Sequence, residues 1–462
     1  MSFFFSLPTA SAQDVIGALA PASFVSDVSA QGSMPASAPM LGRPTRLGGA
    51  GGNKSSLAGW QAYRNYRAGP SGSSSEVARI GQVKMSFGAS GGVSYDTNVN
   101  SSPTAPLADL SVDLGMNLGL YWKATRRNDL QLNLGMNYTK YLQYPQYNAG
   151  GLIIDPNTGL DYRLYFQDFV LTLYDYPSIT NSGAAQDPAI TNSVNFRQLA
   201  NRGGLSLLWH ANRLVFMTGA ERQDTLSLTD EEFSSQNSTG YSWYGVVSCD
   251  ITPTTSAGIR LQASSTEYTQ QVMNNSVAAQ AGIFYQSRLT EYTSITFEAG
   301  MQAATFSSTG KQSDQLTYQE SNGFNTDVTS TLGGTNYAQP YFLLTLMNRL
   351  NRHLSHSLSL SREAAGSSVA NYQEINSASY GLQYRLNRVI KTALYLNYEF
   401  GTISRTAGAM PYSNFTGGLN VSFQIMKNTD FGIGYTYYKN EQSQLAADYT
   451  RQVLTLSVSH QF

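Results

Sequence analysis

Apolar and polar residues alternate strictly along residues 110–122. Every even-numbered position in this segment is apolar, from Leu110 to Trp122, and every odd-numbered position is polar, glycine or Tyr121. A period of two residues predicts a β-strand with one apolar face. Globular strands commonly have about 5–6 residues, so a strand of this length favours a sheet larger than an ordinary sandwich.

The same alternation recurs along most of the chain, in residues 130–138, 392–400, 415–425 and 454–460 among others. Short polar turns separate some of these segments, and longer loops rich in Ser, Asn and Gly separate the others, the longest over residues 306–336. The predicted short turns lie at Thr125, His210, Thr252, Arg288, Asn348, Leu386 and Lys427. Short turns alternating with long loops are typical of a transmembrane β-barrel.

The number of strands follows from the number of turns. One further turn is needed between Lys140 and Tyr176, and the stretch DPNTG at Asp155–Gly159 supplies it. Eight turns and nine loops then predict 18 strands. The strand predicted over residues 149–155 has the weakest alternation, and dropping it and merging a neighbouring strand gives a count of 16. In residues 162–175 either register exposes Gln167 or Asp168 to lipid, which predicts a bulge there.

Composition agrees with an all-β, antiparallel, up-and-down transmembrane barrel. Only 13% of the 462 residues are charged, 12% are aromatic, and the chain has 30 Tyr and 41 Gly. No stretch of 18 apolar residues predicts a membrane-spanning helix. The net charge of −1 gives no attraction to nucleic acid, and the single cysteine, Cys249, excludes an internal disulfide. We therefore expect a barrel in the outer membrane of a Gram-negative-type envelope, in contact with its lipid.

The first 81 residues differ from the rest. Residues 1–12 contain a short apolar run and a small-residue cleavage pattern ending at Ala12, which predicts the remnant of a secretory signal. Residues 13–81 are rich in Ala, Ser, Gly and Pro and predict a disordered linker arm. The barrel is expected over residues 82–462. Aromatic and arginine residues at 60–67 favour an arm that partly plugs the barrel, and the alternative is an arm that is a free tether.

The final strand alternates up to Phe462. A barrel in lipid must pair its last strand with its first, because an open edge leaves backbone groups without hydrogen bonds. A terminal aromatic residue on such a strand resembles the assembly signal of bacterial outer-membrane barrels, which implies recognition of Phe462 by the barrel-assembly machinery. Aromatic residues beside the turns and loops predict two interfacial belts, formed by Trp122, Trp209, Tyr285, Tyr384 and Phe431 at one end and Tyr138, Tyr241, Trp243, Phe400, Phe415 and Tyr437 at the other.

The polar face of the strands predicts the lining of the lumen. Its charged positions carry both signs, at Lys84, Asp113, Arg260, Glu298, Arg385 and Glu399, with Glu221 and Arg451 assigned to the same face. A lining without a dominant sign is not that of a strongly charge-selective pore, and with many Asn, Gln, Ser and Tyr it favours neutral solutes such as sugars. The alternative interpretation is that the polar lining indicates no particular solute, because the lumen of any such barrel must be polar.

Candidate catalytic and metal-binding patterns are weak. Ser90 in GASGG has the spacing of a hydrolase nucleophile, but that site needs a strand-to-helix turn and Ser90 lies within a predicted strand. His353 and Ser355 have the spacing found in outer-membrane phospholipases, at a turn on the opposite side from that family's site. The DPNTG stretch lacks the closing Glu of a calcium loop. We expect no enzyme, no cofactor and no bound metal.

Residues 91–100, GGVSYDTNVN, resemble the opening stretch of the β-barrel porin type 2 group of outer-membrane proteins. Residues 168–179 and 201–216 are similar to early hairpins of the same group. Some members accompany exopolysaccharide-secretion genes. The resemblance implies a barrel and assigns no functional residue. It leaves three functions open: a porin-like channel for transport of small polar solutes, an exopolysaccharide-export barrel that contacts saccharides, and a plugged structural barrel.

Overall fold

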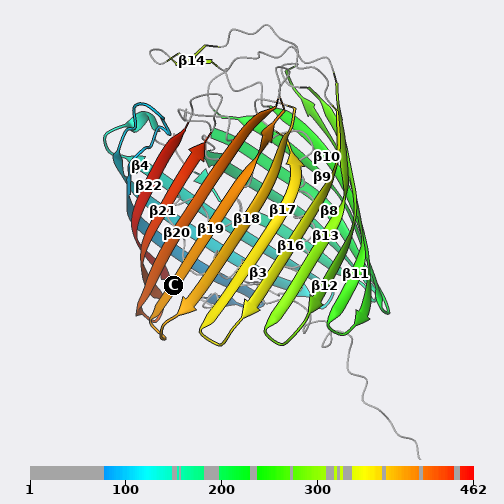
Figure 1. Cartoon of the computed structure of the whole chain (residues 1–462). Helices are drawn as coiled ribbons and strands as arrows, with labels where there is room; N and C mark the ends of the chain where they lie inside the picture. The colour runs from blue at the N-terminus through cyan, green and yellow to red at the C-terminus, as the bar shows by residue number, and fades with distance from the viewer. Residues whose placement is uncertain are drawn as a thin grey trace, which may run out of the picture.

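The computed structural model describes residues 78–147, 153–155, 158–181, 197–228, 237–270, 274–307, 317–319, 323–325, 336–366, 371–404, 409–441 and 448–462. The predicted signal remnant and residues 13–77 of the predicted arm lie outside these ranges. In the described part, 18 long antiparallel strands form one closed barrel (Figure 1). The prediction of an 18-stranded, all-β barrel is therefore confirmed.

Each long strand pairs with its neighbours in sequence, as expected for an up-and-down barrel. The strands are β2 (Val83–Asp96), β3 (Asp109–Thr125), β4 (Asn128–Tyr141), β6 (Gly159–Tyr165), β7 (Phe169–Asn181), β8 (Arg197–Ala211), β9 (Leu214–Ser227), β10 (Ser238–Thr252), β11 (Thr255–Tyr268), β12 (Ser276–Arg288), β13 (Thr293–Phe306), β16 (Tyr337–Arg349), β17 (Leu354–Ala365), β18 (Gln373–Arg385), β19 (Ile390–Ile403), β20 (Met410–Met426), β21 (Thr429–Glu441) and β22 (Tyr449–Gln461).

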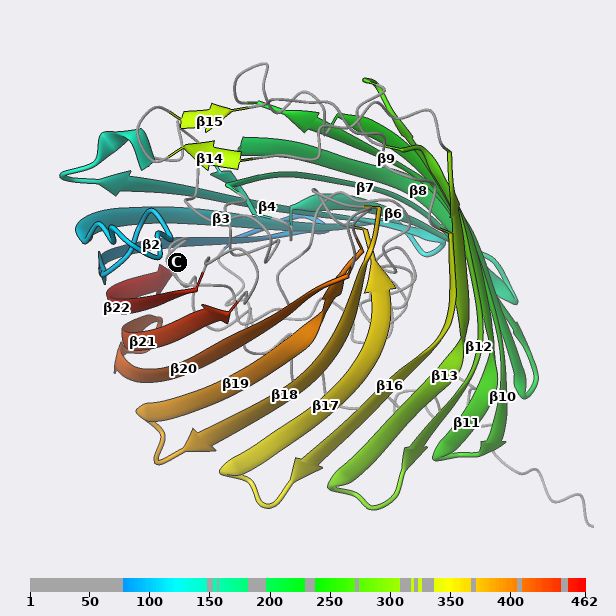
Figure 2. The same cartoon turned by 45° about the horizontal axis from the view of Figure 1, so that its top comes forward.

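Four short strands and one short helix complete the described elements. β1 (Ala78–Ile80) forms a hairpin with the start of β2, so this part of the predicted arm belongs to the sheet. β5 (Ile153–Ile154) follows the 3-10 helix η1 (Pro145–Tyr147). β14 (Thr317–Gln319) and β15 (Gly323–Asn325) pair with each other at the long-loop end, as Figure 2 shows.

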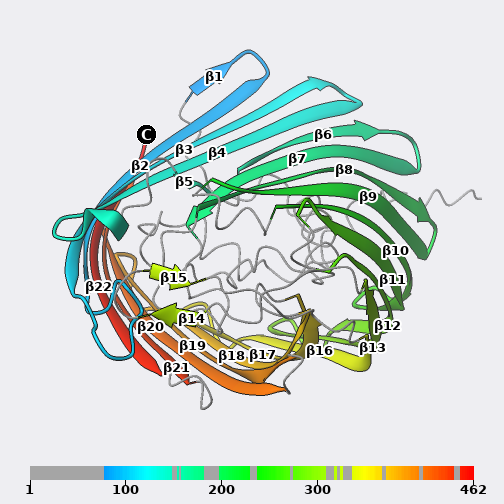
Figure 3. The same cartoon turned by 90° about the horizontal axis from the view of Figure 1, so that it is seen from above.

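Pairing between β2 and β22 closes the barrel, which Figure 3 shows from above. The register runs from Gly88 opposite Gln461 to Asp96 opposite Val453. Beyond it, the Phe462 N–H donates to the Phe87 carbonyl at 2.9 Å. β1 pairs with Val83–Met85, so it continues the same edge of β2 where β22 ends.

The two ends of the barrel differ in their connections. At the short-turn end, adjacent strands are joined by turns of two to four residues, drawn at the bottom of Figure 1. In one of them Asn212 adopts a left-handed conformation, with φ of 57°, which asparagine tolerates better than most residues. Long connections join the strands at the other end.

One predicted hairpin is wrong, although the strand count is right. Residues 166–168 form a short turn between β6 and β7, and the Phe166 N–H donates to the Phe169 carbonyl at 2.9 Å. β5 and β6 both pair with β4 and with β7, so they share one strand position that is interrupted around Asp155. Gln167 and Asp168 lie in this turn, outside the regular alternation, so the bulge predicted within a continuous strand is wrong.

The outward face of the barrel is apolar, as the alternation predicts. Along β3, Leu110, Leu114 and Met116 are exposed, whereas Ser111 and Asp113 are buried toward the interior. Exposed aromatic side chains lie near both ends, including Trp122, Trp209, Tyr285 and Tyr384 at the short-turn end and Tyr138, Tyr241, Trp243 and Phe400 at the long-loop end. This distribution fits an apolar band between two aromatic belts.

Candidate functional site

The candidate site is the inner wall of the barrel, where the predicted lumen charges lie. Asp113, Glu221, Arg260 and Glu298 are buried on the inward face of their strands. Lys84 and Arg385 lie on inward positions near the short-turn end and are exposed. The four buried charges take part in local ion pairs or hydrogen-bonded groups.

Arg260 and Glu298 form a buried ion pair across β12. The Arg260 Nη1 lies 2.7 Å from Glu298 Oε2 and donates to Oε1 at 2.8 Å. Tyr341 Oη donates to the same Oε1 at 3.0 Å. Burial weakens solvent screening, so the two charges largely neutralise each other on the wall.

Two glycines make room for this group. Gly282 and Gly300 lie in one cross-strand row between Arg260 and Tyr341. A β-carbon at Gly282 would collide with the Tyr341 hydroxyl. The absence of side chains at these two positions therefore lets an arginine from β11 and a tyrosine from β16 meet at Glu298.

The combination of tyrosine, glycine and an acid recurs on the inner wall. Tyr412 lies opposite Gly401 and donates to Glu399 Oε1 at 3.2 Å. Tyr174 lies opposite Gly204 and donates across it to Glu221 Oε2 at 3.0 Å.

A fourth instance of tyrosine, glycine and acid lies on β6 and β7. The Tyr176 hydroxyl donates to Asp161, and a β-carbon at Gly159 would collide with the Tyr176 ring. Each tyrosine crosses a glycine to reach a carboxylate, so the inward acids are hydrogen-bonded by wall residues.

Asp96 and Arg451 join the first and last strands near the long-loop end. The Arg451 Nε donates to Asp96 Oδ2 at 2.8 Å, and the Asn98 N–H donates to Asp96 Oδ1 at 3.0 Å. The Asn98 side chain donates to the Thr450 and Ser102 carbonyls. In the stretch YDTN, Asp96 and Asn98 thus hold the β2–β3 loop against β22, which is a structural role.

A row of glutamines crosses four neighbouring strands beside the Arg260 pair. Gln262, Gln280, Gln302 and Gln339 lie directly opposite one another on β11, β12, β13 and β16. The first three are 6%, 8% and 4% exposed. Gln262, Gln280 and Gln302 line a small hollow with Ser264, Ala278 and Tyr337.

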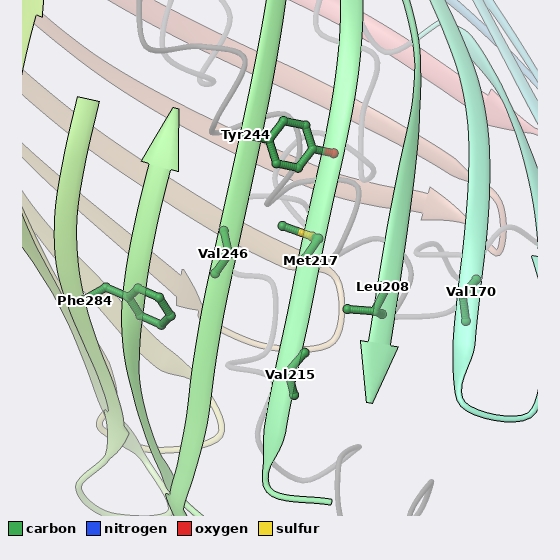
Figure 4. Packing of buried hydrophobic residues seen from close by; sticks show 7 residues of the cluster. All are labelled: Val170, Leu208, Val215, Met217, Tyr244, Val246 and Phe284. Atoms are coloured by element: carbon green, nitrogen blue, oxygen red, sulfur yellow. The ribbon is translucent and has the colours of Figure 1, made fainter. Parts of the chain in front are cut away.

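An apolar patch lies on the inner wall toward the short-turn end (Figure 4). It comprises Val170, Leu208, Val215, Met217, Tyr244, Val246 and Phe284, from five strands between β7 and β12. Tyr165 packs against it. A second buried apolar cluster, Ala278, Ala304, Phe306, Tyr337 and Ala364, lies among β12, β13, β16 and β17, so the inner wall combines apolar patches with polar and charged groups.

Sequence reasoning missed the glutamine row, the glycine gaps and the apolar patch. Alternation identifies which face a residue occupies within one strand. It does not identify the residue opposite, because the register depends on loop lengths and on pairing. The sequence signal for the glutamine row was the repetition of inward Gln residues in consecutive strands.

Candidate catalytic residues have no assembled site in the described ranges. Ser90 lies within the uninterrupted strand β2. His353 lies in the β16–β17 turn, where its Nδ1 is 3.0 Å from the Arg385 carbonyl oxygen and Arg352 Nε donates to its Nε2. Of DPNTG, Pro156 and Asn157 lie outside the described residues.

No group of three or more His, Cys, Asp or Glu side chains suited to a metal ion occurs among the residues described. Within the same ranges, no helix has the length and apolar character needed to cross a membrane.

The fold and its surfaces define the class of protein. An antiparallel barrel with an apolar exterior, aromatic belts, short turns at one end and long loops at the other has the architecture of outer-membrane proteins. This chain is an outer-membrane β-barrel of 18 strands.

No protein-family profile matches the sequence, and no curated protein matches it. Solved structures that resemble it include the outer membrane protein OpdK of Pseudomonas aeruginosa, with a TM-score of 0.46, 10% identity and coverage of 82% of this chain and 99% of that one. OccAB1 of Acinetobacter baumannii has a TM-score of 0.48 and 9% identity, and the match covers 84% of this chain and 99% of that one. A BenF-like porin of Pseudomonas fluorescens has a TM-score of 0.47 and 8% identity, and the match covers 83% of this chain and 100% of that one.

Proposed function

We propose that this barrel is a passive, porin-like channel for small polar solutes and is not an enzyme. The observation that carries the proposal is the pairing of charges on the inner wall. Arg260 pairs with Glu298, Arg451 with Asp96, and Arg163 lies 4.0 Å from Asp129 and 3.9 Å from Asp161. A wall with balanced charges creates a weak net field, which favours uncharged solutes and gives little selection between anions and cations.

Conductance of the refolded, full-length protein in planar bilayers tests the proposal. We expect stable single-channel currents and a reversal potential near zero in a potassium chloride gradient. Swelling of liposomes in neutral sugars should exceed that of liposomes without protein. Absence of both currents and swelling would instead support a plugged structural barrel.

Export of polysaccharide is the second candidate. The resemblance of residues 91–100 to the β-barrel porin type 2 group supports it, since some members of that group accompany exopolysaccharide-secretion genes. Asp96 and Asn98 of this stretch hold a loop in place, so the motif itself contributes no saccharide contact to the argument. Loss of secreted polysaccharide on deletion of the gene, restored by the wild-type gene, would favour export over diffusion.

A further inference from the structure

The glutamine row has the chemistry of a binding site. Each carboxamide offers a donor and an acceptor without net charge, which matches hydroxyl groups that also donate and accept. Adjacent strands lie about 4.8 Å apart, so four amides repeat across roughly 14 Å of wall. An extended chain of sugar units presents hydroxyl groups with a similar repeat.

Two buried polar atoms of the row lack a partner within the described part of the chain. Gln280 Oε1 accepts no hydrogen bond there, and Gln339 Nε2 donates none. Gln280 is 8% exposed and lines the hollow with Gln262 and Gln302. Leaving a buried polar atom unsatisfied costs about 1–3 kcal/mol, and both atoms have almost no exposed surface, so a solute hydroxyl group would satisfy them once a small rotation of the amides turns them toward the lumen.

The surroundings of the row select against charged ligands. Arg260 lies two residues before Gln262 on β11. Opposite Arg260, Gly282 lies two residues after Gln280 on β12. The row is therefore adjacent to the Arg260–Glu298 pair. These two charges face each other at 2.7 Å and attract neither anions nor cations strongly. Tyr244 continues the row on β10, opposite Gln262.

We propose that Gln262, Gln280, Gln302 and Gln339 form a binding subsite for neutral, hydroxyl-rich solutes of the saccharide class. The proposal rests on the proposed channel function and names the class of solute. The amides hydrogen-bond the solute as it lies across the strands, and the paired charges beside them keep the site neutral.

Titration of maltotriose into the refolded, full-length protein in detergent, followed by calorimetry, tests the subsite. The variant Gln280→Met/Gln302→Met keeps side-chain length and removes both amides. It should bind maltotriose at least tenfold more weakly than the wild type. Gln383→Met, an inward glutamine on β18 outside the row, is the matched control and should bind as the wild type does.

Several outcomes overturn the subsite: no binding by the wild type, equal affinity of all three proteins, or equal binding of a polyethylene glycol of similar mass, which lacks hydroxyl groups along its chain. Loss of the heat-modifiable form identifies a misfolded double variant, and Gln280→Met alone then replaces it with the same expected direction. Bilayer conductance separates the two proposals. Ion currents without maltotriose binding overturn the subsite alone, and binding without currents overturns the channel alone.

Discussion

The rings of Phe87 and Phe462 lie 5.1 Å apart on the outward face of the barrel, where the first and last strands meet. The Phe462 N–H donates to the Phe87 carbonyl at 2.9 Å. His460 packs edge-on against the Phe462 ring at 4.5 Å. The seam between β2 and β22 therefore ends in an aromatic contact at the short-turn end.

Deletion of Phe462 should lower the folded, heat-modifiable fraction in the outer membrane. The deletion removes the last backbone bond of the seam and the residue proposed to be recognised by the barrel-assembly machinery. Phe87→Ala is the control, since it removes the ring contact, worth about 0.5–1.5 kcal/mol beyond the area that the ring buries, and leaves Phe462 in place. Recognition by the machinery predicts a larger loss for the deletion in cells than in detergent refolding. An unchanged fraction after deletion contradicts the assembly role.

Leu118→Arg should destabilise the barrel by about 2–4 kcal/mol, because it places a charge on the lipid-facing side of β3. Asn117→Arg should be tolerated, because Asn117 lies on the inward, exposed side of the same strand. Urea unfolding in lipid vesicles measures both. Equal losses of stability in the two variants would show that Leu118 does not face lipid or that Asn117 does not face the interior.

Glu298→Gln should cost about 3–5 kcal/mol, since it leaves the buried Arg260 without its charged partner. Asp224→Asn is the matched control. Its partner Arg222 lies in an exposed pair at 2.9 Å, and such pairs contribute about 0–1 kcal/mol. Unfolding free energies of the two variants in the same vesicles give the comparison. Similar small losses would mean that the Arg260 pair is well solvated.

Gly282→Ala should destabilise the barrel by about 1–3 kcal/mol through overpacking, because the added methyl group collides with the Tyr341 hydroxyl. At Gly91, by contrast, a β-carbon meets its nearest neighbour, Leu114 Cδ2, at 3.8 Å, so Gly91→Ala is the control. Combining Gly282→Ala with Tyr341→Phe should recover part of the loss. No recovery would show that the tyrosine hydroxyl is not the obstacle.

A chain that begins at Ser73 should conduct more than the full-length protein and keep its thermal stability. β1 pairs with Val83–Met85 at the short-turn end, and the apolar patch around Met217 and Val246 offers a surface that a plugging arm would cover. Val246→Asn in the full-length protein should raise conductance similarly and add nothing in the truncated chain. Identical conductance with and without the arm rejects a plug.

Sequence alone determined the class of fold and the facing of most residues. Strict alternation over residues 110–122 identified the lipid and interior faces of β3, since successive side chains in a strand point to opposite sides. Turns such as those at His210 and Lys427 were recognisable from polar residues between apolar runs. Because each of these features depends on neighbours in the chain, they could be read without a structure.

Only the tertiary structure decided which residues of different strands lie opposite one another. The pairing of Arg260 with Glu298, the glutamine row and the apolar patch each join residues from several strands, and their assembly depends on cross-strand register. The turn at residues 166–168 was missed because its polar residues interrupt the alternation without a Gly or Pro signal, whereas DPNTG carries that signal inside an interrupted strand. Register is a property of the closed barrel as a whole, since every strand must pair on both sides at once.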